Sequence, residues 1–418
     1  MSKNGDLGLF ELLDKYPAVP KFVALKLDLQ RRGIRLTEPA LQAVQAPQYR
    51  FERSNIAYTK SDTGYSYPGP VILRDGTTVL TNAGPYQEDQ NADPYYIDHV
   101  DGKFFVNDGG DVIEEVDFTP RPDYFDKLTS RGVPMSSIAS ARPQRLDISP
   151  YRYCHFWDTG EQCKYCAFFT DLKEQRQAAG KDFPKVVDPE DIYETVREAL
   201  KEPGRISQIN LTAGADYSGE TPFENELNRY IEVLQAIGRN FKSDRFSSQL
   251  IAPAYTKAQV KRLYEETKLS SYCPDIEVWD PELFKWICPG KEKWMGRDYW
   301  VQSALDAVEF FGKGNVYTNF VAGAETAQPY GFKTIDEALK SNFEACEYYA
   351  RNGVIFLSLV FRPWKSTAFA GQKQPPLEYY VRLVDGLHKI RKAYGLKSDN
   401  DDFKHCGNHG DSDLERLD

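Results

Sequence analysis

The sequence predicts an α/β protein whose larger part is a partial (β/α)6 TIM-type barrel, preceded by an N-terminal helical and β-rich annex. After residue 145, short apolar runs alternate with amphipathic segments of helical length, which is typical of parallel βα units. Six such units are enough for a partial barrel and too few for a closed eight-stranded one. The 418 residues, 41% hydrophobic and 27% charged, suffice for one large core and an annex.

The part before the barrel divides into helices and a β-rich annex. Two helices are predicted within residues 6–46, where apolar residues recur at helical spacing around the breakers Pro17 and Pro20. In residues 49–117, β-prone runs are separated by the turn pairs Asp75-Gly76, Asp101-Gly102 and Gly109-Gly110. The predicted parts are N-terminal helices at 1–48, the annex at 49–140, the barrel at 141–396 and a polar C-terminal tail at 397–418.

The strands and helices of the barrel follow from the alternation of patterns. The predicted strands are 145–149, 205–212, 246–252, 275–279, 316–323 and 354–361. The predicted helices are 189–201, 221–239, 257–267, 298–311, 335–352 and 376–394. Because the chemistry of parallel barrels gathers at the C-terminal ends of the strands, we expect functional residues just after each strand.

Three cysteines directly follow the first predicted strand. Cys154, Cys163 and Cys166 form a Cys-x8-Cys-x2-Cys array, whereas the other four cysteines are scattered singly. Three thiolates on one loop can hold three irons of a cubane cluster and leave the fourth iron without a protein ligand. An open metal position indicates a catalytic rather than a structural site.

Other interpretations of this array remain open. A structural zinc site would need a fourth ligand, for which His155, or His405, Cys406 and His409 near the C-terminus, are available. An electron-transfer cluster would also require a fourth cysteine nearby, and none is close in sequence. Unrelated buried or surface cysteines are the remaining alternative.

The array and the six-unit pattern resemble the radical S-adenosylmethionine superfamily over residues 145–396. The last spacer residue before the third cysteine is usually aromatic in that family, and Tyr165 matches it. The first spacer has eight residues where the family usually has three, which marks an atypical member. The small-molecule branch of biotin synthase and the hydrogenase-maturation enzymes is the nearest in pattern.

This resemblance implies a [4Fe-4S] cluster and S-adenosylmethionine as cofactors, with Cys154, Cys163 and Cys166 as metal ligands essential to catalysis. The implied reaction is reductive cleavage of S-adenosylmethionine to a 5′-deoxyadenosyl radical, which abstracts hydrogen from a small molecule or a cofactor precursor. Rearrangement, C–C or C–S bond formation and methylation are all compatible with such a start. The cluster also implies sensitivity to oxygen.

Further cofactor-binding residues are implied at the later strand ends. They are Tyr165, Thr212, Ala213, Gly214, Ala215, Gln249, Glu277, Gly323 and Glu325. The segment around Gly214 takes the place of the family's glycine-rich motif, although a plain turn would also require a glycine. Glu277 is placed near the ribose or methionyl group, since a carboxylate in an apolar strand is costly unless it is paired or binds a ligand. For Glu325 a structural turn is an equal alternative, as is a buried hydrogen bond for Gln249.

Net charge and composition limit which binding partners and which cellular location we expect. With 52 basic and 62 acidic residues the net charge is −10, which disfavours binding to a nucleic-acid backbone. The absence of a long apolar run predicts a cytoplasmic protein without a membrane span or secretory signal. We expect a small-molecule substrate and an electron donor such as flavodoxin or ferredoxin.

Three rival functions remain. The chain lacks a cysteine-rich extension and a cobalamin motif, which favours a small molecule over a peptide or RNA as substrate. A zinc-stabilised binding protein without radical chemistry is the rival from another class. A metal-dependent hydrolase would want several histidines at strand ends, and none of the five histidines lies there.

Overall fold

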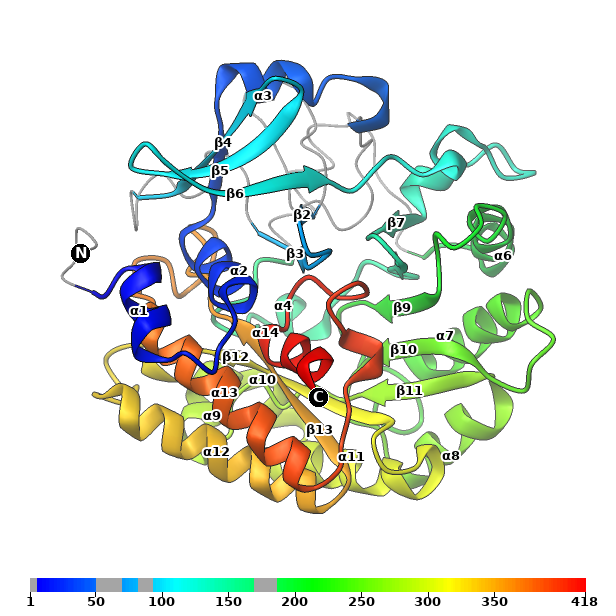
Figure 1. Ribbon diagram of the computed structural model, residues 1–418. Helices are drawn as coiled ribbons and strands as arrows, with labels where there is room; N and C mark the ends of the chain where they lie inside the picture. The colour runs from blue at the N-terminus through cyan, green and yellow to red at the C-terminus, as the bar shows by residue number, and fades with distance from the viewer. Residues whose placement is uncertain (1–5, 50–69, 82–92, 169–185) are drawn as a thin grey trace.

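The computed structural model describes residues 6–49, 70–81, 93–168 and 186–418 (Figure 1). Its larger sheet has the strand order β13 (Val354–Val360), β12 (Val316–Ala322), β11 (Leu269–Cys273), β10 (Phe246–Ile251), β9 (Gln208–Thr212), β8 (Arg145–Ile148) and β7 (Ala139–Ala141). The strands from β8 to β13 pair in parallel, and β7 adds an antiparallel edge. The α/β class is confirmed as a mixed structure with a curled, half-barrel sheet.

Amphipathic helices cover one face of this sheet (Figure 1). They are α6 (Pro189–Ala199), α7 (Glu224–Gly238), α8 (Lys257–Glu266), α11 (Arg297–Phe311), α12 (Ile335–Arg351) and α13 (Leu377–Ala393). Several begin at strong caps: the Asp188 side chain accepts from Glu190, and Thr256 and Thr334 open capping boxes. These helices coincide with the predicted ones to within a few residues.

The predicted fourth strand is wrong. The strand lies earlier, at β11, and residues 275–279 follow it as irregular backbone that touches β12 through one isolated bridge between Glu277 and Phe320. Pro274 ends the strand because it lacks a backbone donor. Glu277 then takes a positive φ of 69°, which no regular strand residue adopts.

A second sheet is formed by strands that precede those of the larger sheet in the sequence. Its order is β1 (Ile34–Leu36), β4 (Tyr95–Val100), β5 (Lys103–Asp108), β6 (Asp111–Phe118), β2 (Val71–Leu73) and β3 (Thr78–Val79). The three predicted turn pairs are confirmed, because each connects two antiparallel strands of this sheet. Parts of the predicted annex fall at residues 50–69 and 82–92, outside the described residues.

The N-terminal helices are α1 (Leu9–Lys15), α2 (Lys21–Arg32) and α3 (Glu38–Ala43), followed by the short η1 (Pro47–Tyr49). Helix α2 is buried along most of its length and packs on α13 and on the short α14 (Gly410–Asp413). Within the described ranges no helix combines the length and apolarity needed to cross a bilayer.

Residues 397–418, here called the C-terminal segment, pack against the larger sheet rather than extending away from it (Figure 1). They contain η6 (Asp399–Asp401), α14 and η7 (Leu414–Leu417). Asp401 pairs with Arg145 of β8 at 2.9 Å, and Asp411 accepts from Ser358 of β13 at 2.7 Å. This segment therefore spans the sheet from β8 to β13.

Candidate functional site

The three clustered cysteines lie on the loop that follows β8. The eight-residue spacer between Cys154 and Cys163 contains a short helix, α4 (His155–Asp158), which Cys154 caps. A second turn brings the amide of Cys166 to the carbonyl of Cys163 at 3.0 Å. The long spacer is therefore folded back, so that it adds a helical turn without separating the first thiol from the other two.

The three thiols influence one another electrostatically. Burial, together with the charge of Cys163, raises the pKa of Cys154 to about 11 and that of Cys166 to about 12. The three side chains remain partly exposed. Thiols held protonated in this way release their protons when a metal binds, since the thiolate is the ligand.

The spacing of these thiols differs from that of a preformed single-ion site. Among the described residues, the one group of three His, Cys, Asp or Glu ligand atoms within 4.8 Å of one another is Asp401, Cys406 and His409. A tetrahedral zinc ion, with Zn–S bonds of about 2.3 Å, holds its sulfurs only ~3.8 Å apart. Cys154, Cys163 and Cys166 do not form such a group, so their sulfur atoms are not all within 4.8 Å of one another.

The junction of α9 (Pro281–Ile287) and α10 (Pro289–Trp294) packs directly on the cysteine loop. The amide of Lys164 donates to Ile287 at 2.9 Å, and the amide of Gly290 donates to Glu161 at 3.0 Å. This pairing brings the buried Cys288 to Cys163. The hydrogen bond from Cys288 lowers the pKa of Cys163, although burial opposes the shift.

A side chain at Gly290 would not fit at this junction. A Cβ there would lie 2.6 Å from the carbonyl oxygen of Glu161 and from the ring of Phe156. The glycine is therefore required by the close approach of α10 to the cysteine loop.

Two residues of this region were missed by the sequence reasoning. Lys291 donates to Glu277 at 2.7 Å and to the carbonyl of Asp275 at 2.8 Å, and its ammonium group lies 4.0 Å from the centre of the Trp300 ring. Its charge, like the Cys288 thiol, acts on Cys163. Neither residue belongs to a short motif, because both reach the loop from a helix pair more than 100 residues later in the chain.

Glu277 lies next to the cysteine loop, in an ion pair with Lys291. Its backbone is fixed between Asn319 and Val321 of β12 by hydrogen bonds of 2.9 and 3.0 Å. Its positive φ is a strained conformation for a residue with a side chain, held by these neighbours. Tyr165 also lies here: burial raises its pKa, and the charges of Cys163 and Glu277 add to this effect.

Thr212 is the last residue of β9, and the segment 213–215 that follows it packs against Cys154. The carbonyl of Ala215 accepts from His155 at 2.6 Å, and that of Gly214 accepts from the Tyr151 hydroxyl at 2.8 Å. A Cβ on Gly214 would lie 2.1 Å from the carbonyl oxygen of Tyr153 and 2.6 Å from the Cβ of Cys154. Close approach to the loop, rather than a turn with positive φ, is thus what requires a glycine at 214.

Gly323 and Glu325 form a closed turn after β12. Gly323 has a φ of 104°, and its amide donates to Glu325 at 2.7 Å. The buried carboxylate also accepts from Asn342 at 2.9 Å and from the Tyr379 hydroxyl. Burial raises the pKa of Glu325. With its oxygens occupied in this way, Glu325 has the structural role that the sequence left as an alternative.

Gln249 lies apart from the cysteine loop. Its amide nitrogen donates to Asp401 of the C-terminal segment at 2.8 Å, and the side chain is fully buried. The neighbouring Ser248 bonds with Phe246 and Ser270. In contrast, the loop after β13 reaches the cysteine loop, because Phe369 donates its amide to Lys164 at 3.1 Å. The residues gathered around the three cysteines are therefore Tyr165, Gly214, Ala215, Glu277, Cys288 and Lys291, whereas no contact of Thr212 or Ala213 with the loop is seen among the described residues.

The chain was compared with known proteins. No family model matches it. It is 24% identical over 294 residues to the bacteriochlorophyllide c C-7(1)-hydroxylase of Chlorobaculum limnaeum, an alignment that covers 67% of each chain. Among solved structures it is similar to a radical SAM methyltransferase from Sphaerobacter thermophilus, with 14% identity, a TM-score of 0.39 and coverage of 94% of this chain and 92% of the other.

Proposed function

We propose that this protein, an enzyme of the radical S-adenosylmethionine superfamily, binds its [4Fe-4S] cluster through Cys154, Cys163 and Cys166 and abstracts hydrogen from a small-molecule substrate. The observation that carries the proposal is the cysteine loop itself. Three partly exposed thiols lie on one loop after the first parallel strand, close enough to influence one another's pKa values. Three thiolate ligands leave one iron of a cubane cluster open to S-adenosylmethionine.

The bound cofactors supply one-electron cleavage of a carbon–sulfur bond in S-adenosylmethionine, which yields the 5′-deoxyadenosyl radical. The chain's own residues hold and shield the site. Gly214 lets the backbone after β9 approach Cys154, and α10 closes over the loop at Gly290. The Glu277–Lys291 pair, with a separation of 2.7 Å, sets a fixed dipole beside Cys163. Fixed dipoles in a site from which water is excluded do not have to reorganise during the reaction.

The name of one relative supports a proposal for the reaction. That protein is a C-7(1)-hydroxylase of bacteriochlorophyllide c. We propose that this enzyme likewise functionalises a C–H bond of a small molecule, with electrons delivered by a flavodoxin or ferredoxin. Residues Arg362, Trp364 and Lys365 follow β13, in the loop that reaches the cysteine loop, and we propose that they border the substrate.

The test is anaerobic reconstitution with iron and sulfide, followed by dithionite and S-adenosylmethionine. We expect absorbance near ~400 nm from the iron–sulfur cluster and 5′-deoxyadenosine by mass spectrometry. Both should be lost in the Cys163→Ala/Cys166→Ala variant and kept in Cys346→Ala, which removes a buried thiol of α12. An unmutated protein that forms no cluster, or 5′-deoxyadenosine that persists in the double variant, would contradict the proposal.

A further inference from the structure

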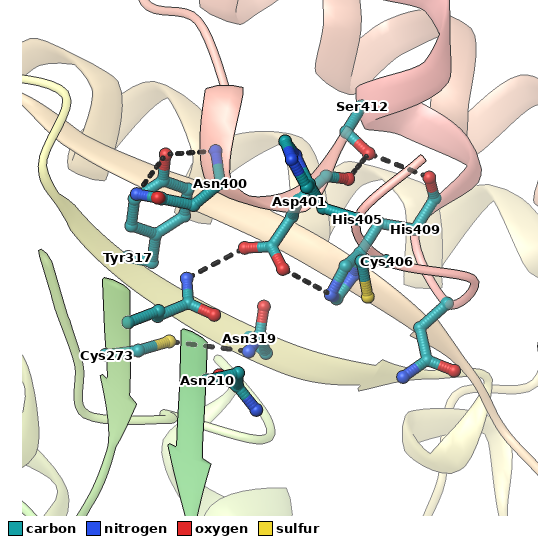
Figure 2. Close-up of polar contacts among 12 residues, drawn as sticks. Asn210, Cys273, Tyr317, Asn319, Asn400, Asp401, His405, Cys406, His409 and Ser412 are labelled. Carbon is teal, nitrogen blue, oxygen red and sulfur yellow. Dashed lines mark hydrogen bonds and ion pairs between the residues drawn. The ribbon is translucent and has the colours of Figure 1, made fainter. Parts of the chain in front are cut away.

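A second group of metal-ligand side chains lies in the C-terminal segment, away from the cysteine loop. Asp401, Cys406 and His409 are each buried, and one ligand atom from each lies within 4.8 Å of the other two (Figure 2). The group faces Gln249 of β10, which donates to Asp401 at 2.8 Å. It is thus enclosed between the C-terminal segment and the larger sheet.

The geometry of the group is close to that of a coordinated ion. His409 Nε2 and Asp401 Oδ1 are 3.9 Å apart, too far for a hydrogen bond between them. A tetrahedral zinc ion with bonds of about 2.0–2.2 Å to nitrogen and oxygen holds such atoms ~3.4 Å apart. A shift of roughly half an ångström would therefore bring these two atoms to the separation that a bound zinc ion requires.

The histidine is oriented as a ligand. Its Nδ1 lies 2.9 Å from the carbonyl oxygen of Ser358, and this contact assigns the proton to Nδ1. The unprotonated Nε2 then faces Cys406 and Asp401 (Figure 2). A backbone carbonyl that receives the second ring N–H is the usual support of a metal-bound histidine.

Cys406 lies among cationic side chains. The Nη1 atom of Arg142 donates to its Sγ at 3.4 Å, and Arg145 pairs with Asp401 of the same group at 2.9 Å.

Ion pairs surround the group. They join the carboxylates of Asp147, Asp401, Asp411, Asp413 and Glu415 to the cations of Lys26, Arg142, Arg145 and Arg391.

Buried acceptors without partners lie beside the group. Within the described part of the chain, the side-chain oxygens of Gln249, Asn210 and Asn319 are buried and accept no hydrogen bond. Gln249 is bonded to Asp401, and Asn210 to Asp147, which pairs with Arg145. Buried orphan acceptors of this kind mark the place of a water molecule or an ion.

We propose that Asp401, Cys406 and His409 bind one divalent zinc-type cation, which fixes the C-terminal segment against β8, β10 and β13. The donor set of one sulfur, one nitrogen and one oxygen is that of zinc rather than of magnesium or calcium. The fourth position is taken by water or by a neighbouring amide oxygen. This site is separate from the cysteine loop and does not depend on the radical chemistry.

The test uses the full chain with Cys163→Ala/Cys166→Ala, so that the cysteine loop cannot bind zinc. After anaerobic purification and dialysis we expect about one zinc ion per chain by mass spectrometry of metals. Adding Cys406→Ser or His409→Gln should lower the zinc content roughly tenfold or more, whereas Cys346→Ser should leave it unchanged. Zinc content that survives Cys406→Ser would overturn the proposal.

A cobalt titration keeps the test decisive where a variant folds poorly. The zinc is removed from the parent with a chelator, and Co²⁺ is then added while circular dichroism confirms the fold. A sulfur-to-cobalt charge-transfer band in the near ultraviolet is expected, saturating at about one equivalent. A folded parent that shows neither zinc nor this band would mean that the group is an ion-pair network completed by protons.

Discussion

Gly214 lies where the backbone after β9 meets the cysteine loop, and it leaves no space for a side chain. In Gly214→Ala the new Cβ would overlap the carbonyl oxygen of Tyr153, now 2.1 Å from that position. Overpacking of this kind costs about 1–3 kcal/mol, and relief requires the loop to move. We expect a lower urea midpoint and a reduced iron content after reconstitution.

The matched control for this substitution is Gly238→Ala at the end of α7. The Cβ there would meet only the Lys268 side chain, at 3.5 Å, an ordinary contact. This variant should keep both the midpoint and the iron content. Equal behaviour of the two variants would show that the approach at Gly214 does not position the loop.

The sequence located residues whose chemistry is carried by a local motif. Cys154, Cys163 and Cys166 are recognisable because they share one loop, and the Gly214 segment because it follows a strand. Lys291 and Cys288 reach the same place only through the packing of α9 and α10 on that loop. The role of Glu325 was likewise undecidable from sequence, because its partners Asn342 and Tyr379 lie on separate helices.

Helix α7 carries a buried carboxyl group that links folding to pH. Glu226 is fully buried and accepts from the amide of Asp216 at 2.6 Å and the Tyr255 hydroxyl at 3.1 Å. Burial raises its pKa from 4.5 to about 8. The folded state therefore keeps a proton that the unfolded chain loses, and stability falls as the pH rises across this interval.

Replacing Glu226 with Gln should remove this dependence. Each unit of pKa difference corresponds to about 1.4 kcal/mol, so the unmutated protein should lose several times that amount relative to Glu226→Gln as the pH rises from 4.5 to about 8. Urea unfolding across this range measures the difference between the two curves. Parallel curves would contradict the assignment.

Helices were predictable from the sequence where the hydrophobic periodicity and the N-capping residues agree. A strand was harder to place where a proline interrupts the apolar pattern. Thr256 and Thr334 are the N-caps of α8 and α12, and their capping boxes are visible in the sequence. Residues 275–279 have an apolar pattern suited to a strand, yet Pro274 and the positive φ at Glu277 place the strand before them. Local composition alone does not register that shift.

At the scale of the whole molecule, the first long helix and the C-terminal segment are joined by a buried ion pair. Lys26 of α2 and Asp413 of α14 lie 2.7 Å apart, and both side chains are fully buried. Loss of one partner leaves an uncompensated buried charge, at a cost of about 3–5 kcal/mol. We therefore expect Lys26→Met and Asp413→Leu each to be strongly destabilising.

The double variant is the informative one. Lys26→Met/Asp413→Leu leaves neither charge unpaired. Its loss in free energy of unfolding should therefore be smaller than the sum of the losses in the two single variants, by a large part of that cost. Urea unfolding of the four proteins completes the cycle. Additive single effects would mean that the two residues act independently.

The predicted partition of the chain rested on composition, which described residues 397–418 as a polar tail. Polarity does not distinguish a solvated tail from a segment that buries several paired charges inside the fold. Three aspartates of this segment can be buried because each pairs with a cation that lies far away in the sequence. The pairs are Asp401 with Arg145, Asp411 with Arg391 and Asp413 with Lys26. Such long-range charge matching is not readable from one sequence.

The order of synthesis gives this arrangement a further meaning. Lys26 leaves the ribosome long before Asp413, which neutralises it, since Asp413 is translated after β13 and α13. Until then, burying Lys26 would be unfavourable, so we expect α2 to reach its final position only once the C-terminal segment has been made. A message interrupted before codon 413 would yield a product that has β1 to β13 but still exposes this charge, and such a product would be a substrate for proteolysis.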